Sequence, residues 1–262
     1  MNKSIPGNYF AKLLVFGLSV LISAPSIAAT AEQSAAFNDA YGEYQEIVSG
    51  QGDQSRLGEV AERVYRLGET VFGPTHTNTA ALSLNYARTL DGEEKVEALE
   101  VSLQLYEDSF GDDAPDLIDP YMELAEANAV MRNVAATREY YVNALQLVEE
   151  HLDAGSQLEG LIQMSIGVID ANSVVGFRER EDHAQATVEI LEAAQEIFEA
   201  QDDAQSRLYL AQTGYALGNF EIQNNNFDDA IEPLLAAVEI FTSFSAEDDI
   251  TIQTHTALVI AY

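Results

Sequence analysis

The residue types that most often carry chemistry are sparse and scattered in this chain. There is no cysteine, and the four histidines are isolated from one another: His76, His151, His183 and His255. None has a partner at the spacing of a metal site on a helix or loop, and no HExxH sequence, EF-hand loop or glycine-rich phosphate loop is present. No serine lies in a nucleophile elbow. We therefore expect no catalytic residue, no metal site and no cofactor, and a structural role for His76.

Carboxylates are so numerous that their pairing carries little information, since the chain has 44 aspartates and glutamates. Three aspartate pairs nevertheless recur between predicted helices: Asp112-Asp113, Asp202-Asp203 and Asp248-Asp249. Such pairs can bind calcium. They can equally cap helices and supply the negative charge that a first helical turn favours. We favour capping. Since no catalytic, metal or cofactor site is expected, recognition of a partner is the predicted activity.

The formal net charge is −32, and the acids are spread through every segment after Glu32. A surface of this sign repels nucleic acid and anionic lipid headgroups, so neither is expected as a partner. Two explanations of the acidity stay open: a basic partner, or a generally acidic surface suited to a salty medium. The even spread favours the second, because a dedicated site would concentrate the charge.

The first 31 residues form a pattern typical of a Sec-type signal peptide. They contain two lysines and no acid, an apolar core at 13–22, and a small-residue stretch at 26–31. We predict a signal peptide at 1–28, cleaved after Ala28 or Ala31, and a periplasmic or secreted protein. Cleavage changes the net charge from −32 to −34. The alternative is an uncleaved anchor, although the apolar run is short for a membrane span; the mature chain has no other candidate.

The remaining sequence is a succession of amphipathic helical patterns without a convincing period-two strand, which predicts an all-α fold. Helices are expected near residues 33–48, 54–72, 77–90, 93–109, 116–131, 134–152, 156–174, 180–200, 203–222, 226–244 and 248–262.

These helices form pairs that recur about every 40 residues. The first helices share a large residue followed by a neighbour that is small in all but the last: Leu82-Ser83, Leu124-Ala125, Ile166-Gly167, Leu217-Gly218 and Leu258-Val259. The second helices share a triplet at i, i+4 and i+7: Lys95, Leu99, Ser102; Thr137, Tyr141, Ala144; Ala186, Ile190, Ala193; Ala230, Leu234, Ala237. The small residues allow close helix packing. The third pair has seven extra residues around 173–180, for which we predict longer helices and a turn at Gly176.

These residues resemble the tetratricopeptide repeat, most clearly at Leu217-Gly218, Phe227, Ala230, Leu234 and Ala237. The loops at Phe72-Gly73-Pro74 and Phe110-Gly111-Asp112 resemble those of kinesin light chains. The resemblance implies a right-handed α-solenoid over residues 54–262, with an incomplete last repeat, preceded by a segment with one helix at 29–53.

Two departures from the family pattern carry expectations. Asn128, Asp170 and Glu221 stand where the family has an aromatic residue, so looser packing is expected there. Pro233 is expected to kink its helix or to mark a late helix start.

Several phrases, including residues 72–80, 106–111 and 116–120, also resemble secreted gammaproteobacterial proteins that end in a TonB-type energy-transducer domain. The chain stops within the first helix of a new pair, which we interpret as the repeat region of such a longer protein. The resemblance implies a periplasmic protein–protein interaction scaffold. The alternative is a stand-alone TPR adaptor in envelope assembly or secretion.

In such arrays the first helices line the concave face, which would hold a protein or peptide of the cell envelope. Helical spacing projects ten residues onto this face: Leu84, Arg88, Met122, Glu126, Met164, Val168, Asn172, Tyr215, Asn219 and Gln223.

Overall fold

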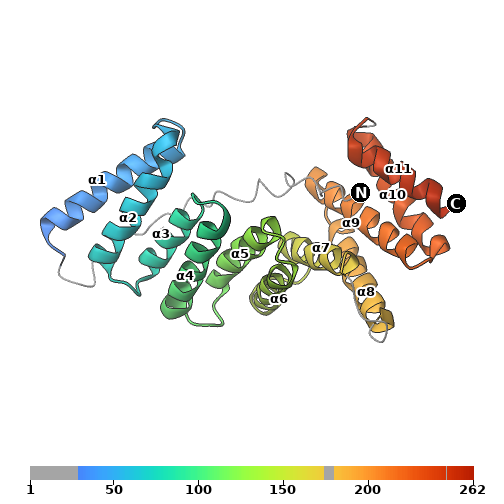
Figure 1. Ribbon diagram of the computed structural model, residues 1–262, viewed down its shortest axis with the longest axis horizontal. Coiled ribbons are helices and arrows are strands. Elements are labelled where there is room, and N and C mark those ends of the chain that lie inside the picture. Colours follow the sequence, from blue (N-terminus) through green and yellow to red (C-terminus); the bar gives the residue numbers. More distant parts are fainter. Residues whose placement is uncertain (1–28, 174–179, 246) are drawn as a thin grey trace. The chain divides into compact units, whose positions relative to one another are not determined.

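A computed structural model describes residues 29–173, 180–245 and 247–262 (Figure 1). Within them lie eleven α-helices and two short 3₁₀ helices, and no strand, which confirms the all-α prediction. The helices are α1 Ala31–Val48, η1 Gln54–Arg56, α2 Leu57–Phe72, α3 Thr77–Ala87, α4 Gly92–Phe110, η2 Pro115–Leu117, α5 Ile118–Val130, α6 Val134–His151, α7 Gln157–Ala171, α8 Arg180–Glu199, α9 Ala204–Gln223, α10 Phe227–Phe244 and α11 Asp249–Ala261. The predicted signal peptide and the turn at Gly176 lie outside the described residues.

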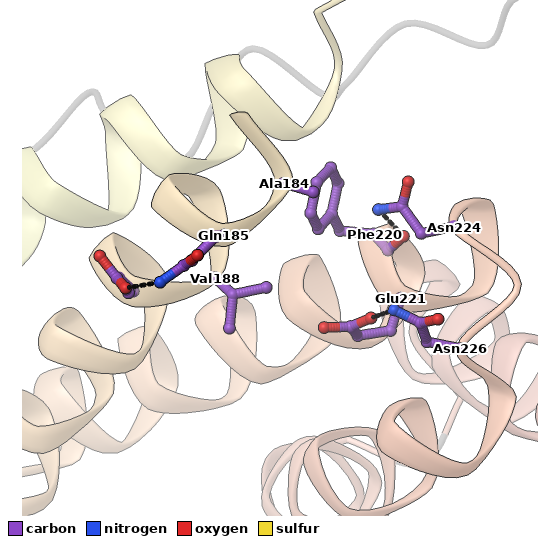
Figure 2. A pocket seen from close by; sticks show the side chains of 8 residues that line it. Ala184, Gln185, Val188, Phe220, Glu221, Asn224 and Asn226 are labelled. Atoms are coloured by element: carbon purple, nitrogen blue, oxygen red, sulfur yellow. Dashed lines mark hydrogen bonds between the residues drawn. The ribbon is translucent and has the colours of Figure 1, made fainter. Parts of the chain in front are cut away.

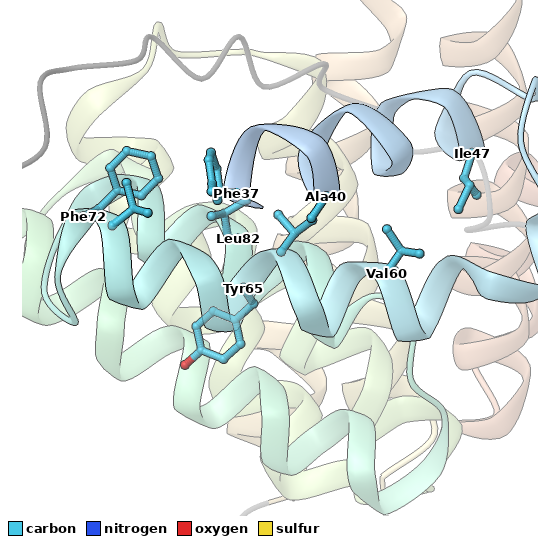
Figure 3. Packing of buried hydrophobic residues seen from close by; sticks show 9 residues of the cluster. Phe37, Ala40, Ile47, Val60, Tyr65, Phe72 and Leu82 are labelled. Atoms are coloured by element: carbon cyan, nitrogen blue, oxygen red, sulfur yellow. The ribbon is translucent and has the colours of Figure 1, made fainter. Parts of the chain in front are cut away.

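The chain divides into two compact units, Met1–Tyr140 and Tyr141–Tyr262, with the division inside α6. Unit 1 begins with a hydrophobic cluster shared by α1, α2 and α3 (Figure 3). It includes the edge-to-face contact of Phe37 and Phe72, whose ring centroids are 5.1 Å apart. Leu82 on α3 belongs to the same cluster, so α1 shares a core with the repeat helices that follow.

Consecutive helices pack closely through the small residues that the sequence pattern singled out. In unit 1, the Ser83 hydroxyl on α3 donates to the Ser102 hydroxyl on α4 at 3.0 Å. In unit 2, a Cβ added at Gly218 would lie 2.8 Å from Cδ2 of Leu234 and closer still to its Cγ. Contacts below 3 Å are closer than carbon atoms tolerate. Glycine is therefore the residue that allows α9 to approach α10.

The predicted packing register is wrong in α8. The fully buried residues are Thr187, Leu191 and Ala194. Each lies one position after a member of the predicted triplet, Ala186, Ile190 and Ala193. Leu191 fills the space opposite Gly167, whose added Cβ would lie 2.6 Å from its Cγ. Both triplets consist of a small, a large and a small residue, so this pattern alone does not distinguish the two registers.

The seven extra residues of the third pair were predicted to lengthen both of its helices, but only the second helix, α8, is longer. α7 ends at Ala171, five residues after Ile166, just as α3 ends at Ala87, five residues after Leu82. α8 instead begins at Arg180, seven residues before Thr187, whereas α6 begins three residues before Thr137. α8 therefore gains about one helical turn at its start.

The polar residues at the aromatic position of the family pattern are buried, and their side chains bridge the turns between helices. Asn128 is 4 % exposed and its Oδ1 accepts from Asn133 Nδ2 at 3.1 Å. Glu221 is 7 % exposed, and its Oε2 accepts from Asn226 Nδ2 at 2.7 Å. In the third pair the His183 ring lies 3.0 Å from the Asp170 carbonyl oxygen. These contacts connect the end of the first helix of each hairpin to the start of the second helix.

Helix ends account for several other features of the sequence. The His76 ring accepts a hydrogen bond from the Asn78 N–H at 3.0 Å and caps α3, which confirms its structural role. The Asp203 carboxylate accepts from the N–H groups of Gln205 and Ser206 and caps α9. Pro233 lies inside α10, which runs without interruption from Phe227, so it does not mark a late helix start.

Candidate partner-binding surfaces

Three of the ten projected residues are core residues, and their assignment to a free surface is wrong. Leu84, Met122 and Met164 are 2 %, 7 % and 4 % exposed. Met164 packs with Ala194 and Phe198 of α8 in a hydrophobic cluster. A first helix is covered by neighbours on several sides, so the face left to solvent is narrower than helical spacing alone implies.

Arg88 and Glu126 belong to a charged cluster on α3, α4 and α5 of unit 1, which we call the acidic surface: Arg88, Lys95, Asp119, Glu123 and Glu126. Arg88 Nε donates to Glu123 Oε1 at 2.8 Å, and a second guanidinium nitrogen lies 3.7 Å from Asp119 Oδ2. Lys95 Nζ approaches Glu123 Oε2 at 3.6 Å. Glu123 thus joins the two cations, and three carboxylates share two positive charges.

Glu126 is the carboxylate that these cations leave without a close partner. No ion pair within 4.0 Å involves it in the described part of the chain. Burial raises its pKa to about 7, the negative charge of Glu123 adds to this, and Lys95 and Arg88 oppose it. A half-buried carboxyl that changes charge near neutral pH responds to any new cation placed beside it.

Sequence reasoning missed three members of the acidic surface, although a signal for two of them was present. Asp119 and Glu123 precede Glu126 at the i, i+4, i+7 spacing that places side chains on one helical face. Lys95 was assigned to helix packing, and its half-buried ammonium instead joins the ion-pair network.

In unit 2 the remaining five projected residues are uncharged, and we refer to them together as the amide surface: Val168, Asn172, Tyr215, Asn219 and Gln223. Asn172 Nδ2 donates to the Val168 carbonyl at 2.7 Å, and Asn219 Nδ2 donates to the Tyr215 carbonyl at 2.9 Å. Because the amide nitrogens are directed to their own helices, the amide oxygens remain available as acceptors. Asn172 and Gln223 are exposed, and the other three residues are half-buried.

The acidic surface and the amide surface lie in different units and differ in chemistry. The first offers carboxylates held among cations, and the second offers amide oxygens beside the Tyr215 ring. The Tyr215 hydroxyl lies 3.4 Å from Gln253 Oε1 on α11, which links α9 to the last helix. Each surface suits a partner that brings hydrogen-bond donors.

Metal and membrane sites were also sought among the described residues. No group of three histidine, aspartate or glutamate side chains there is arranged to hold a metal ion. None of the helices in the same ranges is both long and apolar enough to traverse a bilayer.

Comparison with known proteins identifies the fold from solved structures, whereas comparison of sequences finds no match. No family model matches the chain, and no curated protein matches it. Crystal structures of nearly identical TPR-like repeats of kinesin light chain type from Podosopora anserina, in two versions, superpose with TM-scores of 0.57 and 0.58 at 18 % identity. Each covers 82 % of this chain and 97 % of the other chain. The chain has the TPR-like fold.

A third solved structure agrees. BtubC (BKLC) from P. vanneervenii superposes with a TM-score of 0.53 at 16 % identity, covering 84 % of this chain and 94 % of that one. The TPR-like fold is an all-α solenoid of helical hairpins, which confirms the predicted fold class and the resemblance to kinesin light chain repeats. At such identities the likeness concerns the fold alone.

Proposed function

We propose that this chain is a protein–protein interaction scaffold that binds a segment of a partner protein through the first helices of its hairpins. The observation that carries the proposal is the TPR-like fold over 82 % of the chain, with half-buried, unsaturated acceptors on the exposed faces of α5, α7 and α9. The surface on α5 in unit 1 and the surface on α7 and α9 in unit 2 each suit an extended peptide or a helix that brings hydrogen-bond donors. The negative charge sets partner choice and association rate more than affinity.

The binding surface can be tested by site-specific cross-linking in the source cells. A photoreactive residue at Asn172 or Gln223, exposed on first helices, is expected to capture a defined partner. The same residue at Glu192 or Glu239, exposed on second helices, is the matched control. Equal capture at all four positions, or capture at the second helices alone, would count against the proposed surface.

The acidic surface supplies a second readout. A partner's cationic group placed beside Glu126 lowers the pKa of that carboxyl from about 7. Binding at pH 7 therefore releases protons, and the calorimetric heat should depend on the ionisation enthalpy of the buffer. The Glu126→Gln variant should bind with the same heat in every buffer.

We further propose that the scaffold acts in the periplasm as the repeat region of a TonB-like energy transducer. The signal-peptide pattern at 1–28 and the likeness of residues 72–80, 106–111 and 116–120 to transducer repeat regions support this. An alkaline phosphatase fusion to residues 1–31 should be active, and the exported protein should begin at Ala29. An inactive fusion would refute export.

The gene downstream of Tyr262 distinguishes the transducer from a stand-alone adaptor. A further domain with strand periodicity supports the transducer. A stop codon after one more helix supports an adaptor in envelope assembly or secretion.

A further inference from the structure

Unit 2 contains a pocket of about 360 Å³ between the first turns of α8 and the turn that joins α9 to α10 (Figure 2). Three of its lining residues are apolar: Ala184 and Val188 from α8 and Phe220 from α9. The other lining residues are all carboxylates or amides. A volume of this order accommodates a small ligand or a single long side chain.

Each of the three lining amides donates a hydrogen bond from its nitrogen atom to a neighbouring acceptor. Gln185 Nε2 donates to Glu189 Oε1 at 2.8 Å, Asn224 Nδ2 to the Phe220 carbonyl at 3.1 Å, and Asn226 Nδ2 to Glu221 Oε2 at 2.7 Å. Carboxylates and carbonyls can only accept, so each of these contacts fixes the nitrogen and leaves the amide oxygen as the unused atom. The polar part of the lining is therefore rich in acceptors.

Glu221 is the most informative residue of this lining, because it is a carboxylate at 7 % exposure with one hydrogen-bond partner. Figure 2 shows its second oxygen turned away from Asn226, towards the α8 side of the pocket. No cation lies within 4.0 Å of it among the described residues. A buried carboxylate in this state gains most from a ligand that brings a positive charge and N–H groups.

Closing the turn does not require this charge. In unit 1 the corresponding contact joins two neutral amides, Asn128 and Asn133, at 3.1 Å. The backbone contacts are also the same, because the N–H of Asn133 donates to the Asn128 carbonyl and that of Asn226 to the Glu221 carbonyl, each at 2.9 Å. The negative charge of Glu221 is therefore not needed to hold the turn between α9 and α10.

We propose that this pocket binds an organic cation, an ammonium or guanidinium group on a short alkyl chain, with the charged end at Glu221 and the alkyl part against Val188 and Phe220. The group would come either from a lysine or arginine side chain of a partner protein or from a free alkylamine. The pocket shares no residue with the acidic surface or the amide surface, so this inference does not depend on the function proposed for them.

Calorimetric titration of the full chain distinguishes the two sources. The free amine is represented by 1,4-diaminobutane, and the side chain by the N-acetyl amides of lysine and arginine. Saturable binding of either class supports the proposal and identifies the source. The N-acetyl amide of norleucine has the lysine shape without the charge and should not bind. Absence of saturation by every cation up to about 10 mM, or equal binding of the norleucine compound, would overturn the proposal.

Variants connect the binding to the pocket. Glu221→Gln keeps an acceptor for Asn226 and removes the charge, so affinity should fall about tenfold or more. Gln185→Lys, at an exposed position, supplies a tethered ammonium and should abolish binding without touching the core. Glu192→Gln makes the same charge change at an exposed site of α8 outside the pocket and should leave affinity within about twofold. Equal weakening by Glu192→Gln and Glu221→Gln would show general attraction to an acidic protein and refute the site. If Glu221→Gln does not fold, Gln185→Lys decides alone.

Discussion

The close approach of α9 and α10 at Gly218 leads to a prediction about stability whose sign is opposite to helix propensity. Replacing glycine by alanine inside a helix normally stabilises it by about 1 kcal/mol. At Gly218 the new methyl would meet Leu234, which is fully buried. Overpacking of a core costs about 1–3 kcal/mol. We expect Gly218→Ala to destabilise unit 2 by up to about 2 kcal/mol in net terms, because the propensity gain offsets part of the overpacking cost.

Leu234 provides the test of the mechanism. Leu234→Ala alone should cost about 2–5 kcal/mol because it leaves a cavity. In the double variant the alanine methyl at residue 218 occupies part of that cavity, so the double variant should be about 1–3 kcal/mol more stable than the sum of the single effects. Urea unfolding followed by circular dichroism, with amide hydrogen exchange of α9 and α10, measures both quantities.

Gly42 is the matched control, because it also lies inside a helix, α1, and an added Cβ would meet no atom within 4 Å. Gly42→Ala should stabilise the protein by about 0.5–1 kcal/mol. A stabilising Gly218→Ala, or single effects of Gly218→Ala and Leu234→Ala that add within about 0.5 kcal/mol, would refute the packing argument.

Four further predictions concern charge and capping. The pKa of Glu126 is raised from 4.5 to about 7, so the folded protein binds this proton more tightly than the unfolded chain does. The stability that the proton contributes is complete below about pH 4.5 and is lost as the pH rises to about 7. Glu126→Gln should therefore gain about 1–2 kcal/mol of stability over the native protein between pH 5 and pH 8 in urea titrations, after allowance for solvent contact. Arg88→Gln should raise the pKa of Glu126 further, as an NMR titration would show; a lower pKa would contradict the assigned charges. Ser156→Ala removes the cap of α7 and should cost about 1 kcal/mol in the same unfolding assay, whereas Asp248→Ala, where the side chain makes no capping bond, should change stability much less. Added sodium chloride should raise the thermal midpoint, since screening reduces self-repulsion at a net charge of −32; a falling midpoint would contradict this.

Helix positions and hairpin spacing were predictable because each hairpin contains its own turn and packing signals. The contacts of Ser83 with Ser102 and of Gly218 with Leu234 follow from small residues that are visible in the sequence. The register of α8 was not predictable in the same way. Thr187 is polar and its neighbour Ala186 is not, yet the buried Thr187 hydroxyl donates to the His183 carbonyl at 2.8 Å and is thereby satisfied within the helix.

The candidate surfaces were predictable only in part, because exposure depends on neighbouring helices that no local spacing describes. Arg88 and Glu126 were predicted individually, but the ion pair of Arg88 with Glu123 joins the end of α3 to α5 across 35 positions of sequence. The pocket at Glu221 was missed for a related reason. The sequence shows a glutamate in place of an aromatic residue, and only the structure shows that Asn226 satisfies half of its carboxylate.

Among the described residues of unit 2, three hydrophobic clusters draw on residues 161–198, 211–241 and 230–261. Each of the three joins neighbouring helices, and none of the three extends over all the helices of the unit. Under mechanical tension such an arrangement is expected to give way one hairpin at a time, with several small force steps in place of a single rupture. The molecule would then lengthen and recover in stages, as an extensible tether does.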